Sequence, residues 1–214
     1  MSEAPSRGFP LFPLGIVALP HESIPLHIFE DRYRRLIETC LAAPEGALER
    51  EFGIVWLSEE ELKPIGCACE IDQVLERMDD GRLNILVRGT RPFRLIERQD
   101  DLPFPAGAIE FLHDEEPEPL DPDAAGAAHE LYRELVREAT DRELEGPELE
   151  RLDAYSMAAT VEFAPEAKQE LLELRSETAR LRLLASLLQS ALERLDLLER
   201  AQARALSNGK VRFG

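Results

Sequence analysis

The chain has few of the residues on which most catalytic and cross-linking chemistry depends. Its 214 residues include three cysteines, four histidines and three lysines, against 22 arginines. An odd and sparse set of cysteines forms no disulfide framework, so we expect a reducing, cytoplasmic location. The sequence contains no G-x-x-x-x-G-K-[ST] phosphate loop, no G-x-S-x-G elbow and no H-E-x-x-H zinc motif. These absences predict a protein that is not an enzyme and binds no cofactor or metal.

The sequence also lacks long apolar runs and an excess of positive charge. No apolar stretch is long enough to cross a bilayer, and the N-terminus has no basic-then-apolar signal peptide. The formal net charge is -18, and such a charge repels phosphate groups and anionic lipids. We therefore expect neither nucleic acid nor a membrane as a partner. Four arginines cluster between Arg88 and Arg98, and a solvated strand face explains them.

A few residues with chemical potential are better explained by structural roles. His27 lies among apolar residues and has no partner at catalytic or metal-ligand spacing, so we expect it to hold a strand end or a turn. Cys67 and Cys69 are one residue apart, so they would share one face of a strand and point inward as small apolar groups. Neither pattern predicts a reactive site.

The first half of the chain predicts strands and one helix. Apolar residues, interrupted by proline and glycine, predict two strands within residues 9–29 and single strands at 52–57, 65–78, 82–98 and 104–111. Asp79-Asp80-Gly81 predicts a hairpin turn between two of them. Apolar residues at helical spacing predict a helix over 30–42.

The second half of the chain predicts helices. The acidic, proline-rich segment 114–123 indicates a linker, so we expect a β-rich domain at residues 1–118 and a helical bundle at 119–214. Helices are expected at 124–141, 148–163, 165–174 and 177–206. A seam of apolar residues in the last helix favours a bundle core over a dimeric coiled coil, and its members are Leu181, Leu184, Leu188, Ala191, Leu195 and Leu198.

Several of these segments, taken in order, resemble the N-terminal domain of the ATP-dependent Lon proteases, which is their substrate-recognition region. The resemblance rests on Phe9-Pro-Leu-Phe-Pro-Leu14, Leu19-Pro20, Pro25-Leu-His-Ile-Phe-Glu30, Arg32-Tyr33, Phe52-Gly-Ile-Val55, Ile65-Gly66-Cys-Ala-Cys-Glu-Ile71, Asp80-Gly81-Arg82-Leu-Asn-Ile85, Val87-Arg88-Gly89 and Phe93-Arg94-Leu95. Leu171-Leu-Glu-Leu174 and the leucine-rich helix after it resemble the family's helical part. The resemblance therefore covers nearly the whole chain.

The resemblance implies both a fold and a function. It implies an α+β fold in which a PUA-like β pseudo-barrel precedes a C-terminal helical bundle. Lon proteases continue into an ATPase and a Ser–Lys protease, and this sequence contains neither, so the resemblance implies recognition without hydrolysis. The expected partners are unfolded or peptide segments of proteins, together with a protease or chaperone that the chain serves as an adaptor or regulator.

Two other functions stay open, and the binding residues are inferred from side-chain type alone. PUA-like barrels often bind RNA, and the arginines between Arg88 and Arg98 are the only support for an RNA-binding module, which the acidic charge opposes. A small-molecule enzyme is the third possibility, although no nucleophile, base or metal set converges. For peptide binding, we select Tyr33, Trp56 and Phe104 for their aromatic character, and each would otherwise belong to the core.

Overall fold

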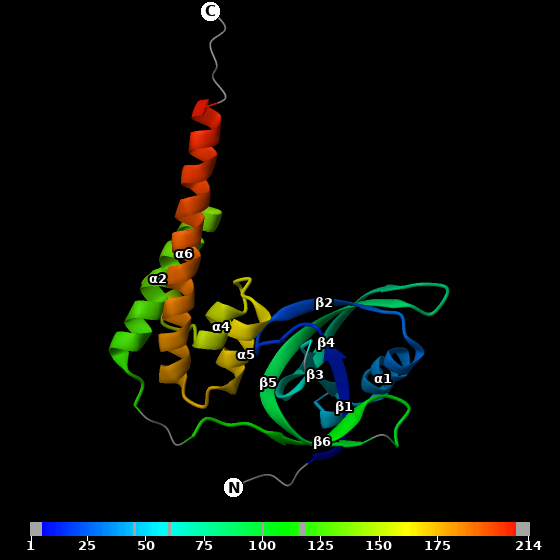
Figure 1. Ribbon diagram of the computed structural model, residues 1–214. Coiled ribbons are helices and arrows are strands. Elements are labelled where there is room, and N and C mark those ends of the chain that lie inside the picture. The colour runs from blue at the N-terminus through cyan, green and yellow to red at the C-terminus, as the bar shows by residue number, and fades with distance from the viewer. Residues whose placement is uncertain (1–5, 45, 60, 100, 116–118, 209–214) are drawn as a thin grey trace, which may run out of the picture. The chain divides into compact units, whose positions relative to one another are not determined.

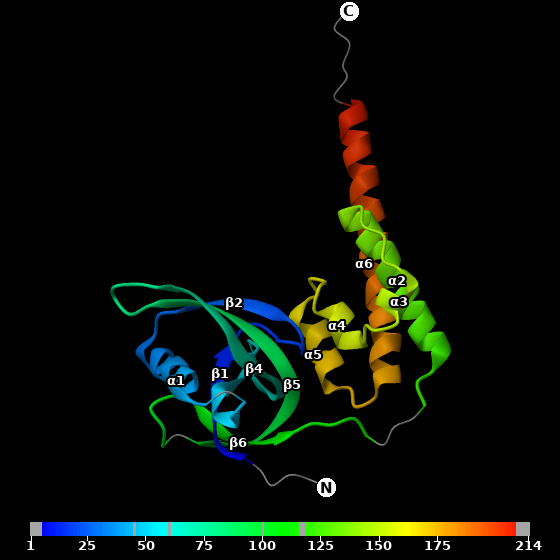
Figure 2. The same ribbon diagram turned by 180° about the vertical axis from the view of Figure 1, so that it is seen from behind.

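The chain has a mixed α+β fold in the computed structural model, which describes residues 6–44, 46–59, 61–99, 101–115 and 119–208 (Figures 1 and 2). Six strands form one sheet, and they are β1 (Ser6–Leu14), β2 (Ser23–Ile28), β3 (Glu51–Leu57), β4 (Leu62–Arg77), β5 (Leu83–Gln99) and β6 (Ala106–Phe111). The helices are α1 (Asp31–Ala42), the 3₁₀ helix η1 (Leu48–Arg50), α2 (Pro122–Thr140), α3 (Gly146–Leu149), α4 (Ala154–Ala158), α5 (Pro165–Glu173) and α6 (Glu177–Asn208).

The chain divides into two compact units. The strand unit contains residues 1–116 and 155–175, and the helical unit contains residues 117–154 and 176–214. The sheet, α1 and α5 thus belong to the strand unit, whereas α2 and α6 belong to the helical unit. Residues 116–118 of the expected linker lie outside the described residues. The boundary expected after residue 118 stays a prediction, for which limited proteolysis within 114–123 is the test.

The strand pairings of the strand unit close the sheet on itself. The strand order is β2-β5-β4-β3-β1-β6, and β5 also pairs with β6. Strands β5, β4, β3, β1 and β6 therefore form a ring, which β2 extends outside. Strand β5 is long enough to serve twice, because residues 83–88 pair with β2 and residues 93–99 pair with β6. The β1–β3 pair is parallel and the other pairs are antiparallel.

The core of the ring is apolar and well packed. Buried residues from all five strands of the ring form it, and they are Phe9, Leu11, Val55, Ala68, Phe93 and Ile109. The rings of Phe9 and Phe93 meet edge to face with centroids 5.6 Å apart. Each such phenyl group contributes about 1.5–3 kcal/mol to stability through burial. This core sets the positions of the strand ends around it.

The cysteine side chains are buried, as expected for Cys67 and Cys69. Burial raises the pKa of the Cys40 thiol to about 12. A hydrogen bond with Cys67, together with burial, raises the pKa of the Cys69 thiol well above its ordinary value. Because the thiolate is the reactive form, these two thiols are chemically inert in the folded chain.

A glycine of β5 anchors the connection between β1 and β2. The Gly89 N–H donates to the Glu22 carbonyl (2.9 Å), and the His21 N–H donates to the Gly89 carbonyl (2.9 Å). A Cβ at Gly89 would lie 2.0 Å from the Leu19 carbonyl oxygen, so a side chain at this position is excluded. The Glu22 carboxylate accepts from the Leu19 N–H and pairs with Lys168 of α5. The same turn thereby holds α5 against the strands of its unit.

One helical expectation was wrong. The helix expected over 148–163 is two short helices, α3 and α4, separated by residues 150–153. The break directly precedes the point, between Ala154 and Tyr155, where the chain leaves the helical unit and enters the strand unit. Glu177 accepts a hydrogen bond from the Ala154 N–H at 2.7 Å, which satisfies a donor at the new helix start. The apolar residues of the sequence continue at helical spacing across residues 150–153, so their pattern did not indicate the break.

The helical unit is built on α2 and α6, which pack against each other. Asp121 caps α2 by accepting from the Asp123 N–H at 3.0 Å, and Pro122 follows at the first helical turn. In α6, the first three members of the expected seam, Leu181, Leu184 and Leu188, are buried, whereas Leu198 is exposed. The seam is therefore a core face in the N-terminal half of the helix.

Candidate functional site

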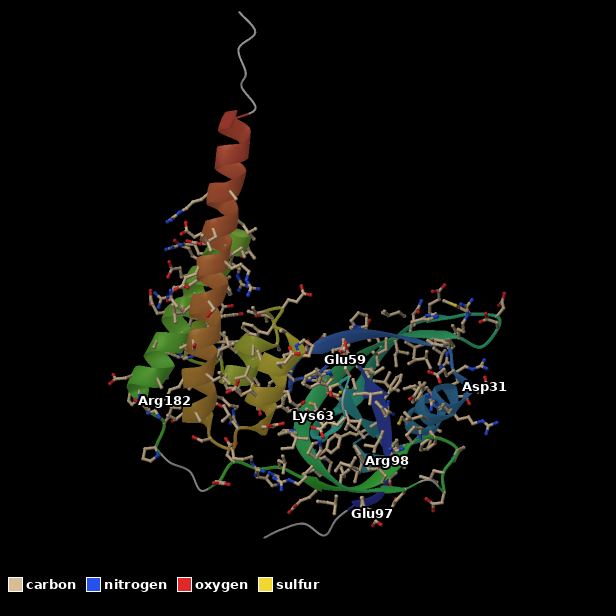
Figure 3. The ribbon with its side chains drawn as sticks, in the orientation of Figure 1. Asp31, Glu59, Lys63, Glu97, Arg98 and Arg182 are labelled. Atoms are coloured by element: carbon tan, nitrogen blue, oxygen red, sulfur yellow. The ribbon has the colours of Figure 1, made fainter. Side chains whose placement is uncertain are left out.

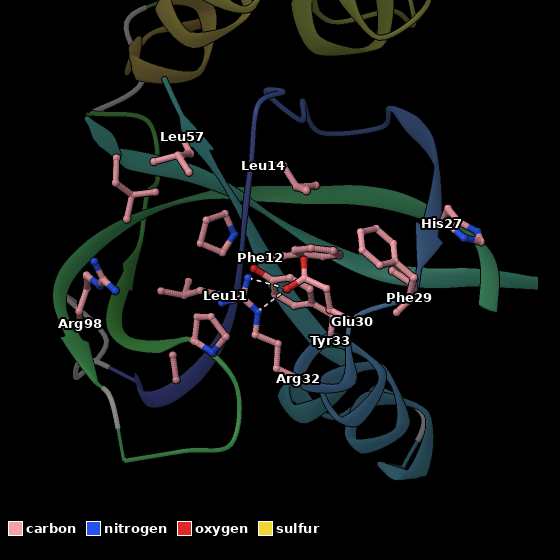
Figure 4. Close-up of a pocket in the computed structure, with 15 residues that line it drawn as sticks. Leu11, Phe12, Leu14, His27, Phe29, Glu30, Arg32, Tyr33, Leu57 and Arg98 are labelled. Carbon is pink, nitrogen blue, oxygen red and sulfur yellow. Dashed lines mark hydrogen bonds and ion pairs between the residues drawn. The ribbon is translucent and has the colours of Figure 1, made fainter. Parts of the chain in front are cut away.

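An apolar pocket of about 430 Å³ opens in the strand unit between β1 and β2 (Figure 4). It is lined by residues 11–14, 27–30, 32–33, 57, 62, 98 and 105–106, which we call the apolar pocket. Most of these side chains are aliphatic or aromatic, and the volume lies within the usual range for ligand sites. The strand unit thus offers a preformed cavity that suits apolar side chains.

Two aromatic residues give this pocket its character. Tyr33 is almost buried, and its ring lies against Phe12 with centroids 3.9 Å apart. Burial raises the pKa of the Tyr33 phenol above its ordinary value, since the charged phenolate would be poorly solvated. Phe29 is 59% exposed, which is unusual for a phenylalanine of a cavity wall. Tyr33 therefore supports the wall, while Phe29 is available for contact.

Phe29 was not among the residues predicted from the sequence, although the alternation of β2 indicates its position. Side chains alternate along a strand, and in β2 the buried positions are Ile24 and Ile28, whereas Pro25 and His27 are exposed. Continued by one step, this alternation places Phe29 on the outer face beside His27. The structure shows the two rings stacked, with centroids 5.9 Å apart.

The polar groups around the pocket are held by short-range bonds. Arg32 pairs with Glu30 at 2.8 Å, and its guanidinium lies 4.6 Å from the Tyr33 ring centroid. His27 Nδ1 and Asn84 Oδ1 are hydrogen-bonded at 2.7 Å. This bond at the end of β2 agrees with a structural role for His27. Arg98 also lines the pocket, and its position there had no signal in the sequence.

The mouth of the pocket lies between two strand edges. Strand β6 pairs with β1 only as far as Pro10, whereas residues 11–14 of β1 pair with β3 on the other side. The Leu11 N–H donates to the Pro105 carbonyl, away from β3, and alternation turns the backbone of Pro13 the same way. Proline suits this place because no N–H is needed there. Within the described residues, no strand pairs with the outer edge of β2.

A second cavity adjoins the first. It has a volume of about 680 Å³ and is lined by residues 15, 56–59, 63, 165–166, 169–170 and 173, which we call the acidic pocket. Leu57 lines both pockets, and Leu14 of the apolar pocket directly precedes Gly15 of the acidic pocket. All of these residues belong to the strand unit. Figure 3 shows Glu59 and Lys63 on the side of the strands nearest α5.

The three aromatic residues selected from the sequence lie in three different places. Tyr33 lines the apolar pocket and Trp56, which is half-buried, lines the acidic pocket. Phe104 is 8% exposed and lines neither, although the next residue, Pro105, lines the apolar pocket. Tyr33 and Trp56 are thus placed in adjoining cavities, and a role of any of the three in binding stays a prediction.

The arginine cluster of β5 is partly neutralised by carboxylates. Arg88 pairs with Glu70 on the neighbouring strand. Arg91 pairs with Glu51 at 3.0 Å, and its guanidinium lies 3.7 Å from the centroid of the Phe111 ring. These contacts reduce the positive charge that a phosphate backbone would meet on this face.

The described part of the chain lacks two other features that could define a site. There, no group of three or more His, Cys, Asp or Glu side chains is arranged to hold a metal ion. No helix in that part of the chain is both long and apolar enough to cross a membrane.

Comparison with known proteins agrees with this architecture. The chain is similar to a Lon N-terminal domain protein from Xanthomonas campestris, with a TM-score of 0.64 and 24% identity over 85% of this chain and 98% of that chain. It is also similar to the N-terminal domain of a Mycobacterium avium complex Lon protease, with a TM-score of 0.63 and 23% identity over 86% and 98% of the two chains. These likenesses show the fold. The family model of the ATP-dependent protease La (LON) substrate-binding domain matches residues 8–190, and the chain therefore belongs to the Lon substrate-binding domain family.

Proposed function

We propose that this chain is a non-catalytic recognition module that binds extended, apolar segments of unfolded proteins or peptides in the apolar pocket. The observation that carries the proposal is the mouth of that pocket, where Phe29 and Leu57 are 59% and 51% exposed beside two strand edges. Exposed apolar groups at a cavity are typical of a binding surface. Membership of a substrate-binding domain family supports the same conclusion.

Strand addition is the binding mode that fits these edges best. A bound segment would lie along the outer edge of β2, where it would exchange main-chain hydrogen bonds with that edge. Residues 11–14 of β1 would contribute side-chain contacts only, because the Leu11 N–H is already bonded and Pro13 has none. Its alternate side chains would enter the apolar pocket and contact Phe29 and Tyr33. Affinity would then come from the backbone, and preference for apolar sequences would come from the pocket.

The adaptor role and the finer description of the fold are part of the same proposal. The ring of five strands extended by β2 is consistent with a PUA-like pseudo-barrel. The sequence has neither the phosphate loop nor the Ser–Lys pair of Lon proteases, which supports recognition without hydrolysis. The chain would either present protein segments to a separate protease or chaperone or withhold them from it. The paired state of Arg88 and Arg91 gives no support to an RNA-binding module.

The decisive experiment compares Phe29→Ala with Leu75→Ala. Both residues are similarly exposed, at 59% and 56%, but Leu75 lies outside the apolar pocket. Binding of a short fluorescent peptide with alternating leucine and serine is measured by anisotropy. Phe29→Ala is expected to weaken binding roughly fivefold to thirtyfold, since truncation of an anchoring aromatic costs about 1–2 kcal/mol. Leu75→Ala should bind like the native chain, and both variants should keep the native melting temperature.

Two further peptides complete this test. Methylation of alternate backbone nitrogens removes the donors needed for strand addition and should abolish binding. An all-serine peptide should not bind. Equal binding by both variants would place the site elsewhere. Tight binding of single-stranded RNA that collapses with added salt, in place of peptide binding, would replace the proposed function by an RNA-related one.

A further inference from the structure

The acidic pocket combines carboxylates that lack counter-ions with an aromatic face. Glu166 and Glu170 project from exposed positions of α5, and neither has an ion-pair or hydrogen-bond partner among the described residues. They lie four residues apart on one helix face, where like charges repel each other. Glu173 ends the same helix, whose last turn contains no basic residue. A bound cation would relieve this repulsion and the unfavourable charge at the helix C-terminus.

The aromatic wall of the pocket suits an organic cation. Trp56 is half-buried and lines the same cavity as these glutamates. The face of an indole attracts an ammonium or guanidinium group. The basic side chain of the lining, Lys63, is engaged by Glu61 at 2.7 Å.

A buried amide adds an observation independent of the charges. Gln169 lines the pocket and is only 4% exposed. Its Nε2 donates to the Ile65 carbonyl at 3.1 Å and to Glu173 Oε1 at 2.8 Å. Its Oε1 is buried and accepts no hydrogen bond from the residues that the structure describes. A donor that reaches this oxygen would satisfy it, which requires the Gln169 side chain to turn toward the cavity.

The geometry favours a side chain over a metal ion. The glutamates do not converge, because no group of three or more potential ligands in the described ranges is arranged to hold a metal. A dispersed set of carboxylates beside an indole instead matches a delocalised or extended cation. Among protein groups, the arginine guanidinium is a delocalised cation, and the lysine ammonium is a compact charge at the end of an extended apolar stem.

The two pockets are arranged to bind one segment. Leu14 of β1 lies opposite Trp56 of β3 in the register of the parallel pair. Leu14 and Leu57 lie on the side of the apolar pocket away from α1 (Figure 4), and the acidic pocket begins at Gly15 and Leu57. An extended segment that leaves the apolar pocket across the ends of β1 and β3 would enter the acidic pocket.

We propose that the acidic pocket is a second subsite of the same groove, which takes the side chain of a lysine or arginine near the apolar residue bound in the apolar pocket. This subsite depends on the proposed function, because it binds a second side chain of the same bound segment. The chain would then select segments in which apolar and basic residues are close together, and it would reject acidic ones.

The test uses three peptides that differ at one position. Each carries the same apolar anchor, followed a few residues later by lysine, by its uncharged isostere norleucine or by glutamate. The lysine peptide is expected to bind the native chain roughly fivefold to tenfold more tightly than the norleucine peptide, in line with the strength of partly exposed cation–π and ion-pair contacts. The glutamate peptide should bind most weakly.

Matched variants assign the preference to the pocket. The double variant Glu166→Gln and Glu170→Gln removes two charges from α5 and should reduce the lysine-to-norleucine ratio to about one. The control, Glu38→Gln and Glu162→Gln, removes two charges from exposed residues outside the acidic pocket and should keep the ratio. Both variants should keep the native melting temperature and the affinity for the norleucine peptide.

The outcomes separate the two proposals. If the lysine and norleucine peptides bind the native chain equally well, the cation subsite is wrong and the proposed function stands. If the ratio falls equally in both double variants, the preference comes from the net charge of the protein, and the subsite is again wrong. If neither peptide binds, the proposed function fails. Loss of the ratio only in the α5 variant establishes the subsite.

Discussion

The apolar pocket and the acidic pocket share Leu57, but they are built in different ways. The walls of the apolar pocket belong to the core, where Tyr33 packs on Phe12 and Leu11 is buried. The acidic pocket includes three exposed glutamates of α5 in its wall. This helix is joined to the strands by the contacts of Lys168 and Gln169. Substitutions that change the shape of the apolar pocket should therefore also lower the stability of the protein. Substitutions that change the charge of the acidic pocket should leave the fold intact.

The largest effect is expected from removal of the wall of the apolar pocket. Tyr33→Ala should lower the free energy of unfolding by about 3–5 kcal/mol, since it deletes a buried aromatic ring and leaves a cavity. Phe104→Ala should have a similar cost, because Phe104 is also buried. Chemical denaturation measures both. A Tyr33→Ala chain that keeps its stability and loses only peptide binding would contradict the distinction between the two pockets.

An intermediate effect is expected from the ion pair that anchors α5. The Lys168 and Glu22 side chains are only 13% and 15% exposed, so Lys168→Met leaves a poorly solvated carboxylate. We expect a loss of roughly 2–3 kcal/mol of stability, less than the cost of breaking a fully buried pair. The preference for the lysine peptide should disappear, while the norleucine peptide still binds. If Lys168→Met keeps the native melting profile but binds neither the lysine peptide nor the norleucine peptide, the two pockets do not act separately.

The smallest effect on stability is expected at Trp56. Trp56→Leu keeps apolar volume at a half-buried position, so the free energy of unfolding should change by less than about 1.5 kcal/mol. The lysine-to-norleucine ratio should fall about threefold, because the π face is lost while the carboxylates remain. Trp56→Phe is the matched control and should keep part of the ratio. An unchanged ratio in Trp56→Leu would remove the indole from the subsite.

The strands and the first helix could be predicted because local patterns determine them. The turn at Asp79-Asp80-Gly81 is an example, since Gly81 has the positive φ of +85° that only glycine adopts readily. The two-part structure of residues 148–163 could not be predicted, because the break depends on Glu177 and on the passage between units. Long-range contacts of this kind leave no periodic signal.

The candidate site was predictable in part for the same reason. Aromatic character located Tyr33 and Trp56 at cavities, but it also selected Phe104, which lines neither pocket. The alternation of β2 would have indicated Phe29. The acidic pocket had no local signal, since three of its glutamates come from α5 and Trp56 comes from β3, more than half of the chain earlier.

The return of residues 155–175 to the strand unit has a consequence for how the protein is made. The ring of strands is complete in sequence at β6, but α5 leaves the ribosome only after α2 and α3 have been synthesised. Until then, Glu22 lacks Lys168 and the Ile65 carbonyl lacks Gln169. Because domains generally fold as units during synthesis, the strand unit would reach its final form late, and the acidic pocket would be the last part of the groove to mature. A nascent chain stalled before α5 would therefore present the apolar pocket without the proposed selectivity for basic residues.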